Sequence, residues 1–175
     1  MQGLIHIYTG NGKGKTSAAV GLGMRAYGRG LKVLMVQFLK GAETGEIFTI
    51  EKLGSGFLLQ RGKEVKKFTW NMNEEELNDL KQSMSELFKA SVESASKSEC
   101  DVLIWDELLG AISTGLIEIN EVISFLKNKP EGLEVIMTGR NAPKELVDIS
   151  HYVSEINAAK HPFDKGIKAR MGIEY

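Results

Sequence analysis

Residues 9–17 have the composition of a loop that binds phosphate. They read Thr-Gly-Asn-Gly-Lys-Gly-Lys-Thr-Ser, and they stand between an apolar run at residues 4–8 and a helical stretch. In a strand–turn–helix of this kind, backbone N–H groups and the positive end of the helix dipole face a bound anion. Lys15 adds a full positive charge, and the Thr16 hydroxyl can bind Mg²⁺. The spacing therefore predicts a nucleotide site formed by Gly10, Asn11, Gly12, Lys13, Gly14, Lys15, Thr16 and Ser17.

The loop departs from the usual motif at its first position. Thr9 stands where the common pattern has a glycine, five residues before the glycine of Gly-Lys-Thr. Gly10, Gly12 and Gly14 still allow the positive φ angles that such a loop needs. A tight connection without a ligand is the alternative interpretation, and the flanking strand, helix and Lys-Thr pair argue against it.

A second candidate element is the acidic pair Asp106-Glu107, which follows an apolar run at residues 102–105. Carboxylate and hydroxyl oxygens are the ligands that Mg²⁺ prefers, and an acid at the end of a strand is typical of a Walker B motif. A strand that ends in two solvated acids is the alternative. Beside the phosphate loop, the pair predicts a site for Mg²⁺ or Mn²⁺ with Thr16, Asp106 and Glu107 as ligands, and either acid fits the role.

Other polar residues follow the ends of predicted strands. Open α/β sheets bind ligands beyond the carboxyl ends of their strands. This rule brings residues 37–40 and 138–140 toward the phosphate loop and the acidic pair. Arg140 is expected to bind phosphate, because its guanidinium group can pair with two phosphate oxygens. A surface arginine at the start of a loop is the alternative.

Hydrophobic periodicity predicts alternating strands and helices. Strands are expected at residues 4–8, 32–38, 57–60, 102–105, 133–138 and 152–156, the last at an edge, and helices at 15–29, 44–53, 73–95, 119–128 and 143–149. Asn73 is the expected N-cap of the longest helix. Gly21 and Gly23 suggest close packing of the first helix against the sheet. The pattern predicts one α/β domain over residues 1–175, with a mostly parallel, P-loop NTPase-like (RecA-like) sheet and helices on both faces.

Composition narrows the class of protein. The net charge is −1 over 175 residues, which gives no electrostatic reason to expect nucleic acid or membrane as a partner. Cys100 is the only cysteine, so an intramolecular disulfide and a Cys-rich zinc site are excluded. No signal peptide or apolar run of membrane-spanning length is recognised, so a cytoplasmic location is expected. The histidines lack the spacing of a transition-metal site.

Several motifs, taken in order, resemble those of the P-loop-type corrinoid adenosyltransferases, also called cob(I)yrinic acid a,c-diamide or cob(I)alamin adenosyltransferases. The phosphate loop is followed by Val-Gln-Phe-Leu-Lys-Gly at 36–41, Phe-Thr-Trp at 68–70, Trp-Asp-Glu-Leu at 105–108 and Thr-Gly-Arg at 138–140. The tail at 160–175, which ends in Met-Gly-Ile-Glu-Tyr, completes the resemblance. It covers nearly the whole chain.

The resemblance implies a reaction. The family transfers the 5′-deoxyadenosyl group of ATP to Co(I) of a corrinoid and releases triphosphate, with the triphosphate reversed in the loop relative to other P-loop enzymes. Because Co(I) is itself the nucleophile, no general base is required. The catalytic residues that the resemblance implies are Lys15, Thr16, Phe68 and Trp70. Phe68 and Trp70 are implied to occupy the lower face of the corrin, which makes Co(II) easier to reduce; taken alone, these aromatics are more typical of a small satellite core.

The resemblance also implies partners: ATP and a corrinoid as substrates, an electron donor such as a flavoprotein, and a second copy of the chain in a homodimer. The tail at 160–175 is expected to shape the site or a dimer contact. Family members often have an N-terminal helix that covers the corrinoid. This chain starts almost at its first strand, so a looser cover, or one made by other residues, is expected.

Two other functions fit the phosphate loop. A P-loop kinase for a small molecule or nucleoside would produce ADP instead of triphosphate, and no Arg-rich lid of the kind many kinases use is recognised. A nucleotide-dependent switch or assembly ATPase would hydrolyse ATP under the control of a protein partner and would bind no corrinoid.

Overall fold

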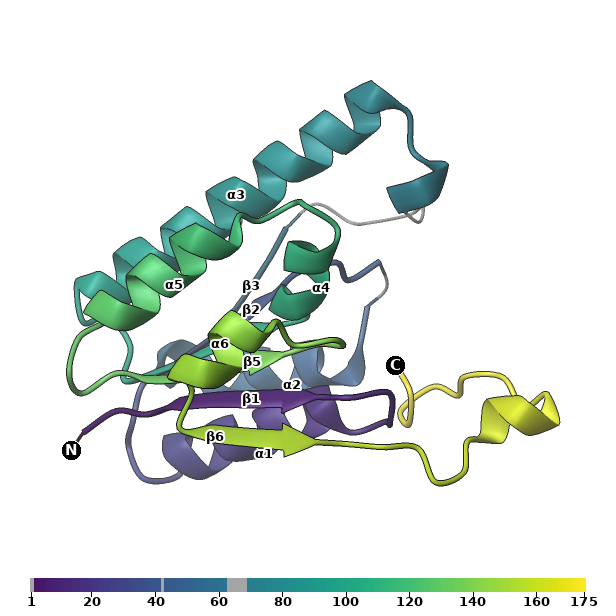
Figure 1. Ribbon diagram of the computed structural model, residues 1–175. Coiled ribbons are helices and arrows are strands. Elements are labelled where there is room, and N and C mark those ends of the chain that lie inside the picture. Colours follow the sequence, from purple (N-terminus) through teal and green to yellow (C-terminus); the bar gives the residue numbers. More distant parts are fainter. Residues whose placement is uncertain (1, 42, 63–68) are drawn as a thin grey trace.

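The computed structural model describes residues 2–41, 43–62 and 69–175, and the side chain of Trp70 lies outside the described part. One six-stranded sheet runs through the molecule in the order β3-β2-β4-β5-β1-β6 (Figure 1). All of its neighbouring strands are parallel. The strands are β1 (Ile5–Thr9), β2 (Val33–Gln37), β3 (Phe57–Arg61), β4 (Val102–Asp106), β5 (Glu134–Thr138) and β6 (Tyr152–Glu155).

Helices cover both faces of the sheet, as predicted (Figure 1). Helices α1 (Lys15–Tyr27) and α2 (Gly45–Leu53) pack on one face, while α3 (Glu74–Ser96), α4 (Leu108–Ser113), α5 (Ile119–Asn128) and α6 (Lys144–Ile149) pack on the other. Short 3₁₀ turns lie at Gly54–Gly56, Thr69–Asn71 and Pro162–Lys165. No helix in the described part of the chain has the length and apolarity needed to cross a bilayer.

The central strands are apolar at nearly every position because helices bury them from both sides. Consecutive side chains of a strand point to opposite faces. Accordingly, Leu103 and Trp105 of β4 belong to the core beneath α3 and α5, whereas Val102 and Ile104 belong to the core beneath α1 and α2. The apolar runs in the sequence therefore mark strands that are buried on both sides.

Helix α3 begins where the sequence predicts. The Asn73 side chain accepts a hydrogen bond of 2.8 Å from the Glu76 N–H, and the Glu76 carboxylate accepts one of 3.1 Å from the Asn73 N–H. This reciprocal capping box satisfies two N–H groups that have no partner within the helix. On the inner face of α3, buried Ser91 Oγ accepts a 2.9 Å hydrogen bond from the Trp105 indole N–H. The largest buried side chain of β4 is thus held in one orientation.

Helix α1 confirms only half of the prediction made for its two glycines. A Cβ at Gly23 would lie 2.9 Å from side-chain atoms of both Ile104 and Phe57, so this helix packs too closely on the sheet for any larger residue. A Cβ at Gly21 would meet nothing within 4 Å, and the residue is exposed. The prediction for Gly21 is wrong, because this residue lies on the solvent side of the helix.

Helix α4 and strand β6 are the other elements to compare with the prediction. Helix α4 was not predicted: it is only six residues long and follows directly on the acidic pair, so it shows too little periodicity to recognise. Strand β6 is the expected edge strand, runs parallel to β1, and is exposed at all of its positions. Residues beyond β6 leave the sheet and then return toward the end of β1 (Figure 1).

Candidate functional site

A cavity of about 530 Å³ lies at the carboxyl ends of the strands, where the rule for open α/β sheets places a ligand site. Its walls come from the phosphate loop, the loop after β2, the first turn of α2, the residues that follow β4 and β5, and the last residues of the chain. The predicted site residues that line it are Asn11, Gly12, Lys13, Gly14, Lys15, Thr16, Ser17, Glu107 and Arg140.

The phosphate loop is supported by the segment that follows β6. The Gly12 N–H donates a 2.7 Å hydrogen bond to the Ile156 carbonyl oxygen. A Cβ at Gly12 would lie 2.8 Å from that oxygen, and one at Gly10, where φ is +103°, would lie 2.4 Å from it. The glycines at these two positions are therefore required by contact with the backbone.

Lys15 extends back over its own loop. The side chain is buried, and Nζ donates hydrogen bonds to the carbonyl oxygens of Gly10 (2.8 Å) and Gly12 (2.9 Å). Burial lowers the pKa of Lys15, and the nearby Glu107 carboxylate partly opposes this shift. The ammonium group is thus held within the loop that is predicted to bind an anion.

Asp106 connects several elements beneath the cavity. Its side chain is fully buried, and Oδ1 accepts hydrogen bonds from the hydroxyls of Thr16 (2.8 Å) and Thr138 (2.7 Å). Oδ2 accepts one from Gln37 Nε2 at 3.2 Å and lies 3.3 Å from Lys40 Nζ. Asp106 therefore positions Thr16 and does not itself line the cavity.

Unlike Asp106, Glu107 lines the cavity. Its backbone is left-handed, with φ +60° and ψ +21°, and its N–H donates a 3.0 Å hydrogen bond to Thr138 Oγ1. A left-handed residue other than glycine costs energy, and such residues cluster at functional sites. Burial raises the pKa of Glu107, the Asp106 carboxylate raises it further, and the cations Lys40, Lys15 and Arg140 oppose the rise. The two acids are thus placed for different roles.

The wall formed by Thr44, Gly45 and Glu46 was not predicted from the sequence. The Glu46 carboxylate accepts a 2.9 Å hydrogen bond from Gln37 Nε2, which also bonds to Asp106. Burial alone would raise the pKa of Glu46, but hydrogen bonds to its carboxylate, including that of Gln37, lower it overall. The position of this loop after a strand's carboxyl end was the signal available in the sequence.

The two aromatic candidates, Phe68 and Trp70, fall next to or within a gap in the described part of the chain. Phe68 lies outside the described residues. Trp70 belongs to the 3₁₀ turn Thr69–Asn71, and its side chain is outside the described part. Their role beneath a corrin stays a prediction from the resemblance.

The donor set fits a small, hard cation. The Thr16 hydroxyl donates a hydrogen bond to Asp106, so the lone pairs of Oγ1 remain available to a metal. The Glu107 carboxylate lies on the same cavity. Over residues 2–41, 43–62 and 69–175, no group of three or more His, Cys, Asp or Glu side chains could hold a metal ion. Further ligands would have to be phosphate oxygens and water.

Comparison with known proteins gives consistent matches. A family model described as ATP:corrinoid adenosyltransferase BtuR/CobO/CobP matches residues 1–175. The chain is 35% identical over 175 residues to the corrinoid adenosyltransferase of Escherichia coli (strain K12), covering 99% of this chain and 86% of the relative. It is 37% identical over 175 residues to the corrinoid adenosyltransferase CobA of Salmonella typhimurium, with the same coverage.

Among solved structures, the KaiC-like protein PH0186 from Pyrococcus horikoshii OT3 is similar, with a TM-score of 0.51 at 14% identity. The match covers 91% of this chain and 75% of that one. At this identity the likeness shows the fold alone, and it agrees with the predicted P-loop NTPase-like architecture.

Proposed function

The chain belongs to the ATP:corrinoid adenosyltransferase family, and from that premise we propose how its cavity serves the transfer of an adenosyl group. In the family reaction, Co(I) of the corrinoid attacks C5′ of ATP. The Co–C bond forms with the electron pair of cobalt, the C5′–O5′ bond breaks, and triphosphate leaves with that bonding pair. The protein's task is to hold C5′ in line with cobalt and to stabilise the negative charge of the leaving group.

One observation supports this role above the others: Lys13, Lys15, Lys40 and Arg140 converge with Thr16 on a single cavity at the carboxyl ends of the strands. A chain of three phosphates carries several negative charges, and charge-assisted hydrogen bonds from ammonium and guanidinium groups are the strong ones. The N–H groups of Asn11 and of residues 13–17 add donors at the N-terminus of α1. We assign the triphosphate to this loop, in the orientation that exposes C5′ to the corrinoid.

A divalent cation fits the same place. We assign its direct ligands to Thr16 Oγ1 and the Glu107 carboxylate, and we assign to Asp106 the role of orienting Thr16 through their 2.8 Å hydrogen bond. Bound there, Mg²⁺ or Mn²⁺ would neutralise charge on the triphosphate.

The remaining assignments rest on the resemblance. Phe68 and Trp70 cover the lower face of the corrin, an electron donor such as a flavoprotein supplies Co(I), and two copies form a homodimer. A cytoplasmic location is proposed on a different ground, because no signal peptide or membrane-spanning run is recognised in the sequence. Residues 1–175 act as one domain, which is consistent with a single sheet that extends from β1 to β6.

The direct test is to incubate the protein with ATP, Mg²⁺ and a chemically reduced corrinoid. We expect a light-sensitive Co–C bond, detected by its absorbance, and triphosphate in equal amount. Formation of ADP without a Co–C bond would indicate a kinase and would contradict the proposal. Formation of ADP and phosphate without corrinoid binding would indicate a switch ATPase.

A further inference from the structure

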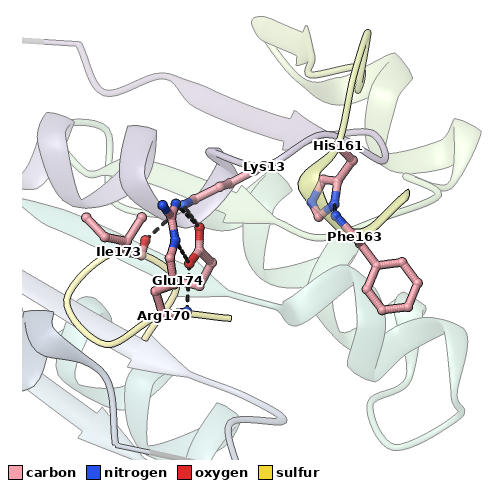
Figure 2. Close-up of polar contacts among 6 residues, drawn as sticks. All are labelled: Lys13, His161, Phe163, Arg170, Ile173 and Glu174. Atoms are coloured by element: carbon pink, nitrogen blue, oxygen red, sulfur yellow. Dashed lines mark hydrogen bonds and ion pairs between the residues drawn. The ribbon is translucent and has the colours of Figure 1, made fainter. Parts of the chain in front are cut away.

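The last residues of the chain bind back onto the phosphate loop. Lys13 Nζ donates a 2.9 Å hydrogen bond to the Ile173 carbonyl oxygen and lies 2.8 Å from Glu174 Oε1 (Figure 2). Gly172, Ile173, Glu174 and Tyr175 form part of the wall of the cavity that is assigned to the nucleotide. The C-terminal segment, defined here as residues 170–175, therefore places a carboxylate where the proposed ligand is an anion.

Within the C-terminal segment, Arg170 holds the Glu174 carboxylate by three hydrogen bonds. Arg170 donates to the Glu174 carboxylate from its backbone N–H (2.8 Å), Nε (3.2 Å) and Nη2 (3.2 Å) (Figure 2). These bonds and the one from Lys13 lower the pKa of Glu174 to about 2, so the carboxylate is ionised at neutral pH. The segment thus offers Lys13 a permanent negative charge.

Little else attaches this segment to the rest of the molecule. Between described residues, the hydrogen bonds that join residues 170–175 to the chain before residue 158 both come from Lys13. Every residue of the segment is exposed; Met171 is 82% exposed and Ile173 is 57% exposed. Because few apolar contacts would be lost, the segment can leave the loop at small cost.

Lys13 and Lys15 differ in where their hydrogen-bond acceptors lie along the chain. Lys15 donates to carbonyl oxygens of its own loop, those of Gly10 and Gly12. Lys13 donates to Ile173 and Glu174, which lie 160 and 161 positions further along the chain. A phosphate that binds Lys15 changes only local contacts. The C-terminal segment takes two of the three N–H donors of Lys13, so a phosphate that binds Lys13 through more than one of them has to replace it.

We propose that the C-terminal segment is a displaceable strap, in which Glu174 occupies on Lys13 the place of a phosphate oxygen until a triphosphate group removes it. The inference rests on the assignment of the triphosphate to the loop. The strap competes with triphosphate before the reaction, and its return to Lys13 afterwards favours release of the triphosphate product. Ligand and strap compete for the N–H donors of one ammonium group.

The test measures the affinity for inorganic triphosphate by calorimetry in the wild-type chain and in Glu174→Gln. Removing the competing charge should tighten binding by about two- to five-fold, the range expected for loss of one exposed ion pair. Glu93→Gln is the matched control, because it also removes one carboxylate from an exposed ion pair, with Lys97 on α3. The control should leave the affinity unchanged, and 5′-deoxyadenosine should bind all three proteins equally.

A second variant ends the chain after Met171 and removes both acceptors of Lys13. It should also bind triphosphate more tightly, and in the wild-type chain triphosphate should speed hydrogen exchange at the amides of residues 170–175. Unchanged or weaker binding in both variants would overturn the strap, because the segment would then be an ordinary surface contact or part of the nucleotide site. If none of the proteins bound triphosphate, the phosphate assignment itself would fail, which is a different result.

Discussion

Thr16 Oγ1 and Asp106 Oδ1 lie 2.8 Å apart, which joins the first turn of α1 to the end of β4. Strand β5 runs between β4 and β1, and its last residue, Thr138, donates to the same carboxylate oxygen. One buried acid thus aligns the ends of neighbouring strands with the phosphate loop. This arrangement makes the position of the Thr16 hydroxyl depend on the sheet and not on the loop alone.

Lys15→Ala should strongly weaken ATP binding. The variant removes a charge-assisted contact to phosphate, and a contact of this kind contributes about 1.5–3 kcal/mol, or roughly a 10- to 150-fold change in affinity. Calorimetry with ATP and Mg²⁺ would measure it. Lys89→Ala, which removes an exposed lysine of α3, is the control and should bind as the wild type does. Near-normal ATP affinity in Lys15→Ala would refute the phosphate assignment.

Asp106→Asn should weaken binding of the divalent cation in the presence of ATP. Both oxygens of Asp106 face donors, whereas asparagine has one acceptor oxygen. Its amide nitrogen would therefore meet either the two hydroxyls or the nitrogens of Gln37 and Lys40, and the hold on Thr16 would weaken. Loss of such an orienting partner typically costs about 10- to 100-fold in metal affinity. Electron paramagnetic resonance of Mn²⁺ would measure the change, with the exposed Asp148→Asn as the control. An unaltered Mn²⁺ affinity would show that Asp106 has no part in the metal site.

Trp70→Ala should slow the reaction from Co(II) far more than the reaction from chemically prepared Co(I). The family role assigned to this side chain is to keep the axial base from cobalt, which matters for reduction and not for the attack on C5′. Rates of Co–C bond formation from both starting states would measure the effect. Equal losses from the two states would eliminate this role for Trp70.

Gly21→Ala and Gly23→Ala should shift stability in opposite directions, although both lie inside α1. Alanine at Gly21 meets nothing and should stabilise the helix by about 0.5–1 kcal/mol. Alanine at Gly23 would press on Ile104 and Phe57 and should cost about 1–3 kcal/mol. Urea unfolding followed by circular dichroism would measure both. Shifts of the same sign would mean that the packing of α1 on the sheet differs from that described here.

Cys100 should make the protein less stable in alkaline solution. Burial raises the pKa of its thiol to about 12, with smaller contributions from Asp101 and Glu99. Because the folded pKa lies above the unfolded value of 9.0, the folded state holds this proton more tightly. The contribution of Cys100 to the free energy of unfolding should be constant below pH 9 and should fall as the pH rises from 9 toward 12, by about 1.4 kcal/mol per pH unit.

Urea unfolding near pH 8 and near pH 10 would measure this effect in the wild type and in Cys100→Ala. The difference between the two proteins separates the contribution of the thiol from that of other groups that titrate in this range. The fall in free energy of unfolding between these pH values should be smaller in the variant. In the native wild type, alkylation of Cys100 at pH 8 should also be slow. Equal alkaline losses in both proteins would contradict the assigned pKa shift.

Local sequence patterns were enough to predict most of the fold and about half of the residues that line the cavity. Residues 9–17 could be recognised because a strand, a glycine-rich turn and a helix are adjacent along the chain. Asn73 was predictable as an N-cap because its partner, Glu76, is three residues away. By contrast, Glu46 was missed because its importance comes from Gln37, whose own role depends on the pairing of β2 with β4.

The sequence by itself determined most of the elements, the glycine-rich loop between β1 and α1 and, through the order of its motifs, the family. Only the tertiary structure separated the two acids, with Asp106 buried behind Thr16 and Glu107 on the cavity wall. It alone also brought Glu174 to Lys13 across 161 positions of sequence. The physical reason is that periodicity reports which face of an element is buried, whereas strand order and the return of the chain decide which distant side chains meet.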